Sequence, residues 1–147
     1  MDNAITDLLD AIIPELDGFL SDMRFWMGLV MLLGPILLVA LGVYYFFYAP
    51  PEANHKLGYR THYGMGSVAA WKFTQAFAGR VWGFLGLGLL VVAIVGCVLM
   101  GSSEPGQAAM SGLLILGLEA LSVLVGYGVI EITVASRYDK DGNLKKK

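Results

Sequence analysis

Three long apolar runs constrain the fold of this chain more than any other feature of its sequence. They cover residues 25–48, 81–103 and 105–130, and only the third contains a charged residue, Glu119. A helix of about 20 predominantly apolar residues crosses the hydrocarbon core of a bilayer. Because lipid cannot satisfy backbone N–H and C=O groups, such runs form helices. The sequence therefore predicts an all-α membrane protein with three transmembrane helices.

The composition supports this class. Charged residues make up 15% of the chain, against about 25% in a typical soluble domain. A length of 147 residues fits one domain, so we expect a single membrane domain over residues 1–147. The only cysteine, Cys97, lies inside the second apolar run. It fits a small core residue better than a disulfide or a metal ligand.

Residues 1–23 precede the first span and carry a different pattern. Their apolar residues recur at steps of three and four, which is the spacing of one helical face: Ile5, Leu8, Leu9, Ile12, Ile13, Leu16, Phe19 and Leu20. We expect an amphipathic helix at the outer surface of the membrane. One alternative is a simple lead-in helix at the interface. Another is a helix that packs on its own protein or on a partner, because interfacial helices usually carry a basic polar face and this one is acidic.

Lysine and arginine are unevenly distributed between the segments outside the spans. The segment before the first span has only Arg24, and the turn between the last two spans has none. The loop at 49–80 and the tail at 131–147 hold the rest: Lys56, Arg60, Lys72, Arg80, Arg137, Lys140, Lys145, Lys146 and Lys147. Because such residues accumulate on the cytoplasmic side, we expect the N-terminus outside and the loop and C-terminus in the cytoplasm.

The loop at 49–80 is richer in unusual residues than a simple connector. Its glycines allow backbone conformations that other residues avoid, which predicts a compact turn over 58–66. Ser67 fits an N-cap, so we expect a helix to begin there and to continue into the second span. Within the turn, Arg60 can bind a phosphate or carboxylate through two N–H groups. The alternative is a structural pair with a protein carboxylate or a lipid phosphate.

The motifs of the loop and tail resemble the SdpI family of small bacterial membrane proteins. The resemblance rests on Asn54, Gly58-Tyr59-Arg60-Thr61, Trp71, Ala78-Gly79, Glu131-Ile132 and Tyr138-Asp139-Lys140-Asp141-Gly142-Asn143. The family is named after an immunity protein against a secreted killing peptide. The resemblance implies a protein of the bacterial inner membrane that protects its cell from a membrane-active peptide toxin by binding. It also implies signalling, in which a transcriptional repressor is held at the membrane as a cytoplasmic regulator.

Two acidic residues are further candidates. Glu119 falls near the middle of the third span, where a carboxylate is costly unless it is paired, protonated or hydrated. It could serve a small proton-linked transporter, or it could be a protonated side chain that bonds a neighbouring helix. Glu131 lies at the cytoplasmic end of the same span, where a salt bridge to Arg60 would join the two motifs. A third possible role for the chain is an accessory subunit whose loop binds a cytoplasmic partner.

Enzymatic and metal-binding roles find little support. The sequence has no nucleophile–base pattern, no phosphate-binding glycine-rich loop and no nucleic-acid module. His55 and His62 match no metal-ligand spacing, so we expect no catalytic residue, metal, cofactor or nucleic-acid partner. The tail after Tyr138 fits a helix-ending turn better than a calcium loop, because the final Glu is missing. Small residues spaced at Gly79 and Gly83 favour close helix packing, and we expect a homo-oligomer, most simply a homodimer.

Overall fold

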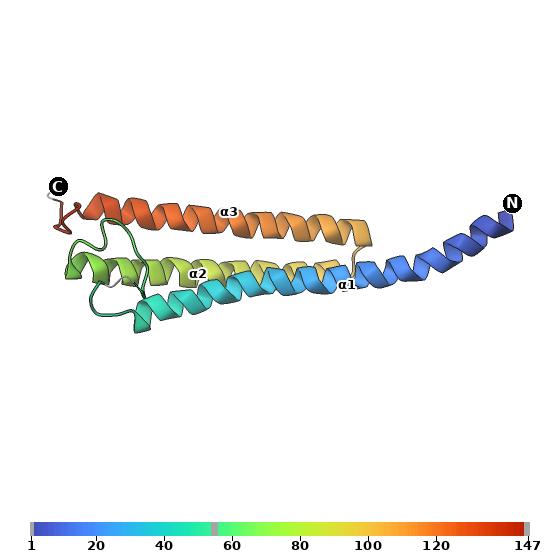
Figure 1. Ribbon diagram of the computed structural model, residues 1–147, viewed down its shortest axis with the longest axis horizontal. Coiled ribbons are helices and arrows are strands. Elements are labelled where there is room, and N and C mark those ends of the chain that lie inside the picture. The colour runs from blue at the N-terminus through green and yellow to red at the C-terminus, as the bar shows by residue number, and fades with distance from the viewer. Residues whose placement is uncertain (1, 54–55, 146–147) are drawn as a thin grey trace.

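The computed structural model describes residues 2–53 and 56–145, and this part of the chain forms a bundle of long helices (Figure 1). The elements are α1 over Asp2–Val43, a short π-helix η1 over Tyr44–Tyr48, α2 over Val68–Gly101 and α3 over Pro105–Arg137. α1 and α3 run in the same direction and α2 runs opposite to them. The loop at 49–67 and the C-terminal tail lie at the same end of the bundle, which we call the loop end.

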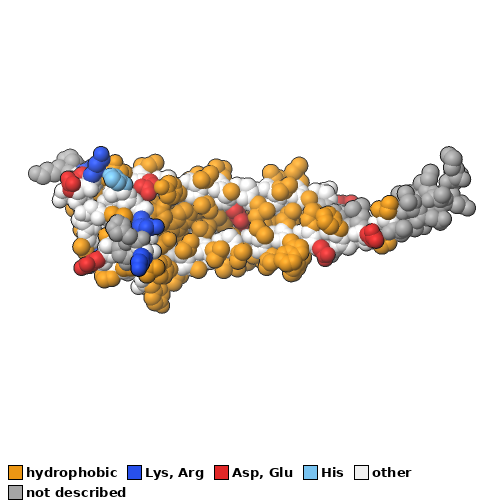
Figure 2. Space-filling view, in the orientation of Figure 1, with side chains coloured by type: hydrophobic (Ala, Val, Ile, Leu, Met, Phe, Trp, Pro, Cys, Tyr) orange, Lys and Arg blue, Asp and Glu red, His pale blue; other side chains and the backbone are white. Residues whose placement is uncertain are grey.

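The three predicted spans are confirmed. Helices long and apolar enough to cross a membrane cover Asp22–Tyr48, Val68–Gly101 and Gly106–Arg137. Large hydrophobic side chains point outward from all of them, including Phe84 at 75% and Leu124 at 69% exposure. Figure 2 shows this apolar surface along most of the bundle. A soluble monomer rarely exposes so large a patch, so the surface fits a lipid environment.

The helices begin and end where the sequence supplies the appropriate residues. Ser67 has an extended backbone and its hydroxyl accepts the Ala70 N–H at 3.1 Å, which confirms the predicted N-cap. The helix that it starts continues into the second span, as predicted. Pro105 lies in the first turn of α3, where its missing N–H costs no helical hydrogen bond. Ala49, which follows η1, is extended, as is usual before a proline.

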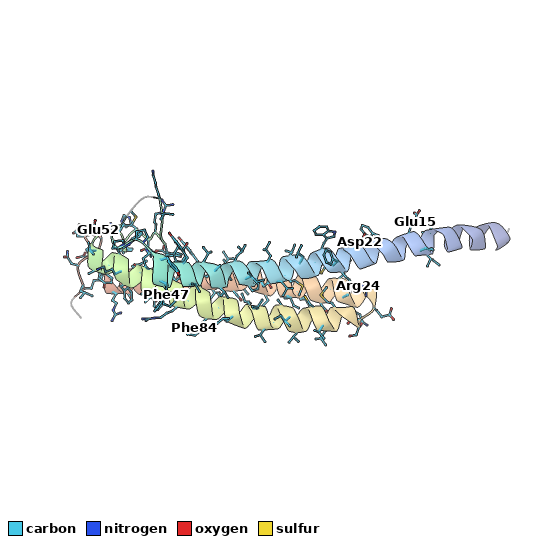
Figure 3. The ribbon with its side chains drawn as sticks, turned by 90° about the horizontal axis from the view of Figure 1, so that it is seen from below. Glu15, Asp22, Arg24, Phe47, Glu52 and Phe84 are labelled. Carbon is cyan, nitrogen blue, oxygen red and sulfur yellow. The ribbon has the colours of Figure 1, made fainter. Side chains whose placement is uncertain are left out.

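The first helix differs from the predicted layout. The sequence predicts a separate amphipathic helix over 1–23, whereas α1 passes from that segment into the first span without a break. The residues at the junction, Asp22, Met23 and Arg24, contain no glycine or proline to stop the helix. Figure 3 shows Glu15 on the part of α1 that projects beyond the bundle. The amphipathic character of this part and its place at the membrane surface remain predictions.

Glycines bring α1 and α2 into close contact. A Cβ on Gly42 would collide with the backbone nitrogen of Gly83 and would lie 2.9 Å from the Gly79 carbonyl oxygen. A Cβ on Gly86 would likewise lie only 2.7 Å from the backbone nitrogen of Val39. The small-residue motif of Gly79 and Gly83 therefore packs on α1 within one chain. This packing needs no second copy, and the homodimer stays a prediction.

Candidate functional site

The loop is held on the start of α2 by a reciprocal pair of hydrogen bonds. The Tyr59 backbone N–H donates to Oε1 of Gln75 at 2.8 Å, and Nε2 of Gln75 donates to the Tyr59 carbonyl at 2.7 Å. Gln75 is only 4% exposed. A buried amide requires partners for both of its ends, and here one loop residue supplies both. The position of the loop along α2 is fixed by this pair.

Trp71 lies at the centre of the same contact. Its side chain is fully buried and its indole N–H donates to the Pro50 carbonyl at 2.7 Å. Gly58 has a φ of 102° and lies against the ring, so that a Cβ there would come within 2.6 Å of Cζ2 of Trp71. Glycine alone tolerates both this φ and this approach. We call this set the loop junction: Pro50, Gly58, Tyr59, Trp71 and Gln75.

A second turn of the loop is buried beside the junction. Thr61 is 2% exposed, and its hydroxyl accepts the Gly64 N–H at 2.8 Å. Thr74 of α2 is fully buried and donates to the Ala70 carbonyl at 2.8 Å. A Cβ at Gly64 would collide with the hydroxyl oxygen of Thr74. Thr61, which belongs to the predicted motif, therefore shapes the turn.

The C-terminal tail docks on the N-terminal turn of α2. The Ser67 hydroxyl donates to the Gly142 carbonyl at 2.7 Å, and Gly142 adopts a φ of 75°. The Asp139 carboxylate accepts the backbone N–H groups of Asn143 at 2.8 Å and Asp141 at 3.0 Å. These bonds, that of Asn143 above all, hold the pKa of Asp139 below its ordinary value. The tail is a closed turn, as predicted.

The ring of Tyr59 lies where the loop meets η1, α2 and α3. Its centroid is 5.7 Å from that of Tyr45, 6.3 Å from that of Trp82 and 6.5 Å from that of Tyr127. Its buried hydroxyl has no hydrogen-bond partner within residues 2–53 and 56–145. Burial raises the pKa of Tyr59, and the negative charge of Glu131 raises it further. Tyr59 is therefore a neutral phenol at physiological pH.

The predicted site residues fall into separate places. Thr61 adjoins the loop junction, which contains Gly58, Tyr59 and Trp71 of the motif. Besides burial, the charge of Glu131 contributes to the raised pKa of Tyr59. Arg60 is exposed, and its salt bridge with Glu131 stays a prediction. Asn54 lies outside the described residues. Glu119 precedes Glu131 by three helical turns, or about 18 Å at about 1.5 Å per residue, and forms a second site.

Glu119 lines a pocket of about 470 Å³ between α1 and α3. Its side chain is 8% exposed, and Oε1 is buried without a hydrogen-bond partner in the described part of the chain. The other oxygen, Oε2, lies 3.2 Å from where a Cβ of Gly34 would be. We call this pocket the α1–α3 groove, and it is lined by Val30, Leu33, Gly34, Pro35, Leu37, Leu38, Leu89, Leu116, Glu119, Ala120 and Val123.

Sequence reasoning missed the role of Gln75 and the bond between Ser67 and Gly142. A sequence signal for Gln75 was available. It lies one helical turn after Trp71 and therefore on the same buried face of the helix, where a polar side chain needs a partner. No sequence signal indicated that Gly142 is the partner of Ser67, since the two residues are far apart in the sequence. Within residues 2–53 and 56–145, no group of three His, Cys, Asp or Glu side chains could hold a metal ion.

Comparison with known proteins places these features in a family. No curated protein and no solved structure matches the chain significantly. The model of the SdpI/YfhL protein family matches residues 52–132, which is more than half of the 147 residues. The matched region contains most of the loop junction, all of α2 and most of α3, including Glu119 and Glu131. This chain therefore belongs to the SdpI/YfhL protein family.

Proposed function

We propose that this protein protects a bacterial cell from a membrane-active peptide toxin by binding the peptide, without catalysis. The observation that carries the proposal is the family match over residues 52–132, because the family takes its name from a protein with this role. The matched region combines two membrane helices with a loop whose Tyr59 backbone N–H and C=O are both hydrogen-bonded to Gln75 of α2. Such a region suits a stable binding surface.

The surface on which a peptide meets this protein lies largely in the lipid. A membrane-active peptide partitions into the bilayer, where the outward faces of α1 and α3 are its first contacts. These faces expose long apolar side chains such as Leu33, Leu37 and Leu113. Helices associate in lipid through close packing and polar contacts, and that mode of binding needs no catalytic group.

We propose that the loop end lies in the cytoplasm of a bacterial cell with the N-terminus outside. Basic side chains gather at the loop end in Figure 2. The loop, the first turns of α2, the end of α3 and the tail contain Lys56, Arg60, Lys72, Arg80, Arg137, Lys140 and Lys145, whereas the opposite end has Arg24. This asymmetry supports the orientation, since lysine and arginine favour the cytoplasmic side. The loop and tail then form the inner surface on which a cytoplasmic repressor is held.

The test is a peptide challenge of cells with and without the protein. Sensitive bacteria are exposed to a panel of membrane-active peptides, and their membrane potential is followed with a dye. We expect cells that contain the protein to keep their potential at peptide concentrations that depolarise the other cells. Absence of protection across the panel, with the protein present in the membrane, would refute the proposal.

Matched glycine variants connect protection to the fold. Gly58→Ala adds a Cβ against the Trp71 ring at a φ of 102°, whereas Gly117→Ala adds a Cβ with nothing within 4 Å. Both variants gain one methyl group, and their amounts in the membrane are compared by immunoblot. We expect Gly58→Ala to reduce protection and Gly117→Ala to preserve it. Equal protection by both would show that the loop junction does not contribute.

A proton-linked transporter is the second candidate, and the buried Oε1 of Glu119 beside the α1–α3 groove favours it. Transport predicts that proteoliposomes of the wild type carry a proton flux that Glu119→Gln abolishes. A pH-sensitive dye inside the vesicles measures this flux. If the wild type and Glu119→Gln both match empty vesicles, transport by Glu119 is excluded and the immunity proposal is unaffected.

A further inference from the structure

The α1–α3 groove has the shape of a helix-docking site. Its walls come from one face of each helix, because the lining residues recur at steps of three and four: Val30, Leu33, Gly34 and Leu37 of α1, and Leu116, Glu119, Ala120 and Val123 of α3. Each wall is about two turns long, or roughly 10 Å. Since α1 and α3 run in the same direction, the two walls form one elongated channel.

Small residues and exposed rims make the groove accessible from the lipid. Gly34 and Ala120 lie on opposite walls, and small residues at such positions allow a further helix to approach closely. The side chains along the rim face outward, with Leu33 and Leu37 each 52% exposed and Val123 37% exposed. A helix that arrives through the bilayer therefore meets the groove directly.

Glu119 gives the groove a chemical preference. Figure 2 shows acidic atoms among hydrophobic side chains about midway along the bundle. The three apolar runs at 25–48, 81–103 and 105–130 contain no lysine or arginine, so the chain supplies no cation at this depth. An unpaired carboxylate in hydrocarbon is costly, and pairing with an opposite charge removes much of that cost. A second copy would bring the same cation-free spans, so the complementary charge belongs to a different molecule.

We propose that the α1–α3 groove binds a helical segment of the membrane-active peptide and that Glu119 pairs with a lysine or arginine side chain of this segment. The inference rests on the proposed function and adds the place and the chemistry of recognition. A lysine or arginine can lay its apolar stem along the leucine-lined walls while its charged group reaches the carboxylate. Gly34 places no side chain beside Oε2, where a Cβ would lie 3.2 Å from that oxygen.

Carbodiimide labelling of the protein in lipid nanodiscs tests the proposal. Dicyclohexylcarbodiimide dissolves in lipid and reacts with protonated carboxyl groups, and mass spectrometry identifies the modified residue. Glu119 is expected to react because it borders a lipid-accessible groove. The competitors are a leucine-rich helical peptide with one central lysine and the same peptide with leucine at that position. The lysine peptide should protect Glu119 at about tenfold lower concentration, the ratio that one intramembrane polar contact provides.

Matched variants separate groove binding from general effects. Ala120→Phe fills the groove, whereas Leu124→Phe enlarges an exposed residue of the same helix that does not line it. We expect Ala120→Phe to weaken protection by the lysine peptide and Leu124→Phe to leave it unchanged. Labelling of the exposed Glu104, which lies just before α3, with a water-soluble carbodiimide at acidic pH serves as the internal reference. Circular dichroism confirms that both variants keep their helix content.

Three results would overturn the proposal. Glu119 could fail to react while Glu104 reacts, which would show a closed groove. The two peptides could protect equally, which would exclude recognition by the carboxyl group. Protection could rise with the number of protein copies per nanodisc alone, which would identify a second copy as the occupant. If the lysine peptide protects Glu119 but cells gain no resistance, the groove remains a cation-selective site and the immunity function fails.

Discussion

Replacement of Gln75 by methionine should release the loop from α2. Methionine has nearly the same length and shape, so packing around residue 75 changes little. The substitution removes both hydrogen bonds to Tyr59, of 2.8 Å and 2.7 Å. Each is partly buried, so we assign about 1 kcal/mol to each, within the usual range for a lost bond. The loss of about 2 kcal/mol should raise the open population of the loop about 30-fold.

Limited proteolysis measures this opening. Lys56 and Arg60 are trypsin sites inside the loop, and cleavage of a transiently opened segment follows the population of the open form when closing is fast. The cleavage rate of Gln75→Met in detergent should therefore exceed that of the wild type by about 30-fold. Gln107→Met is the matched control, since Gln107 is exposed near the start of α3 at the other end of the bundle.

A cleavage rate within about twofold of the wild type would refute the reasoning. It would mean that the Trp71 indole, bonded to the Pro50 carbonyl at 2.7 Å, holds the loop without help from Gln75. An equal increase in Gln107→Met would point instead to a general effect of methionine on the detergent-solubilised protein. Neither result would alter the family assignment, which rests on the sequence match alone.

Three further predictions concern the tail and the helix contact. Ser67→Ala removes the N-cap and the bond to Gly142 and should lower the free energy of thermal unfolding by about 1–2 kcal/mol. Ser136→Ala, which removes the bond from the Ser136 hydroxyl to the Thr133 carbonyl within α3, should change little. The pKa of Asp139 is lowered, so the tail turn should keep its full stability at pH values above the ordinary aspartate pKa of about 3.9 and lose it as the pH falls through the lowered pKa. The rate of amide hydrogen exchange at Gly142 measures this stability, and Asp139→Asn should remove its pH dependence. Gly42→Ala forces α1 away from Gly83 and should destabilise the protein by about 1–3 kcal/mol. Gly88→Ala adds a Cβ with no other atom within 4 Å and should leave the same thermal unfolding unchanged.

The features that the sequence predicted correctly depend on local information. A span requires only enough consecutive apolar residues, and the cap at Ser67 and the start at Pro105 each depend on one residue type beside a helix. The closed tail turn likewise depends on neighbours, because Asp139 bonds residues two and four positions away. These interactions do not depend on how the helices pack against one another, so the local sequence is sufficient to predict them.

The features that sequence analysis missed depend on how distant segments meet. The continuity of α1 from residues 2–23 into the first span is one such feature, because the spacing of an apolar face does not show where a helix ends. The pairing of Gln75 with Tyr59 requires the loop to turn back on α2, and the turn depends on Gly58 fitting over the Trp71 ring. Glu119 was recognisable as an acid within the third apolar run. The approach of Gly34 to Glu119 was not predictable. It depends on how α1 is rotated about its own axis, and the contact between Gly42 and Gly83 sets that rotation.

The loop junction and the α1–α3 groove are mechanically connected through the first turns of α2. The segment that follows α1 is attached there by the bond from Trp71 to Pro50, and the segment that follows α3 is attached by the bond from Ser67 to Gly142. The two helices that form the walls of the groove are therefore both fixed, at the loop end, to residues one turn apart on a third helix. We therefore expect a ligand that changes the separation of α1 and α3 to strain these two hydrogen bonds. Such strain would carry the effect of binding in the middle of the membrane to the surface of the loop and tail.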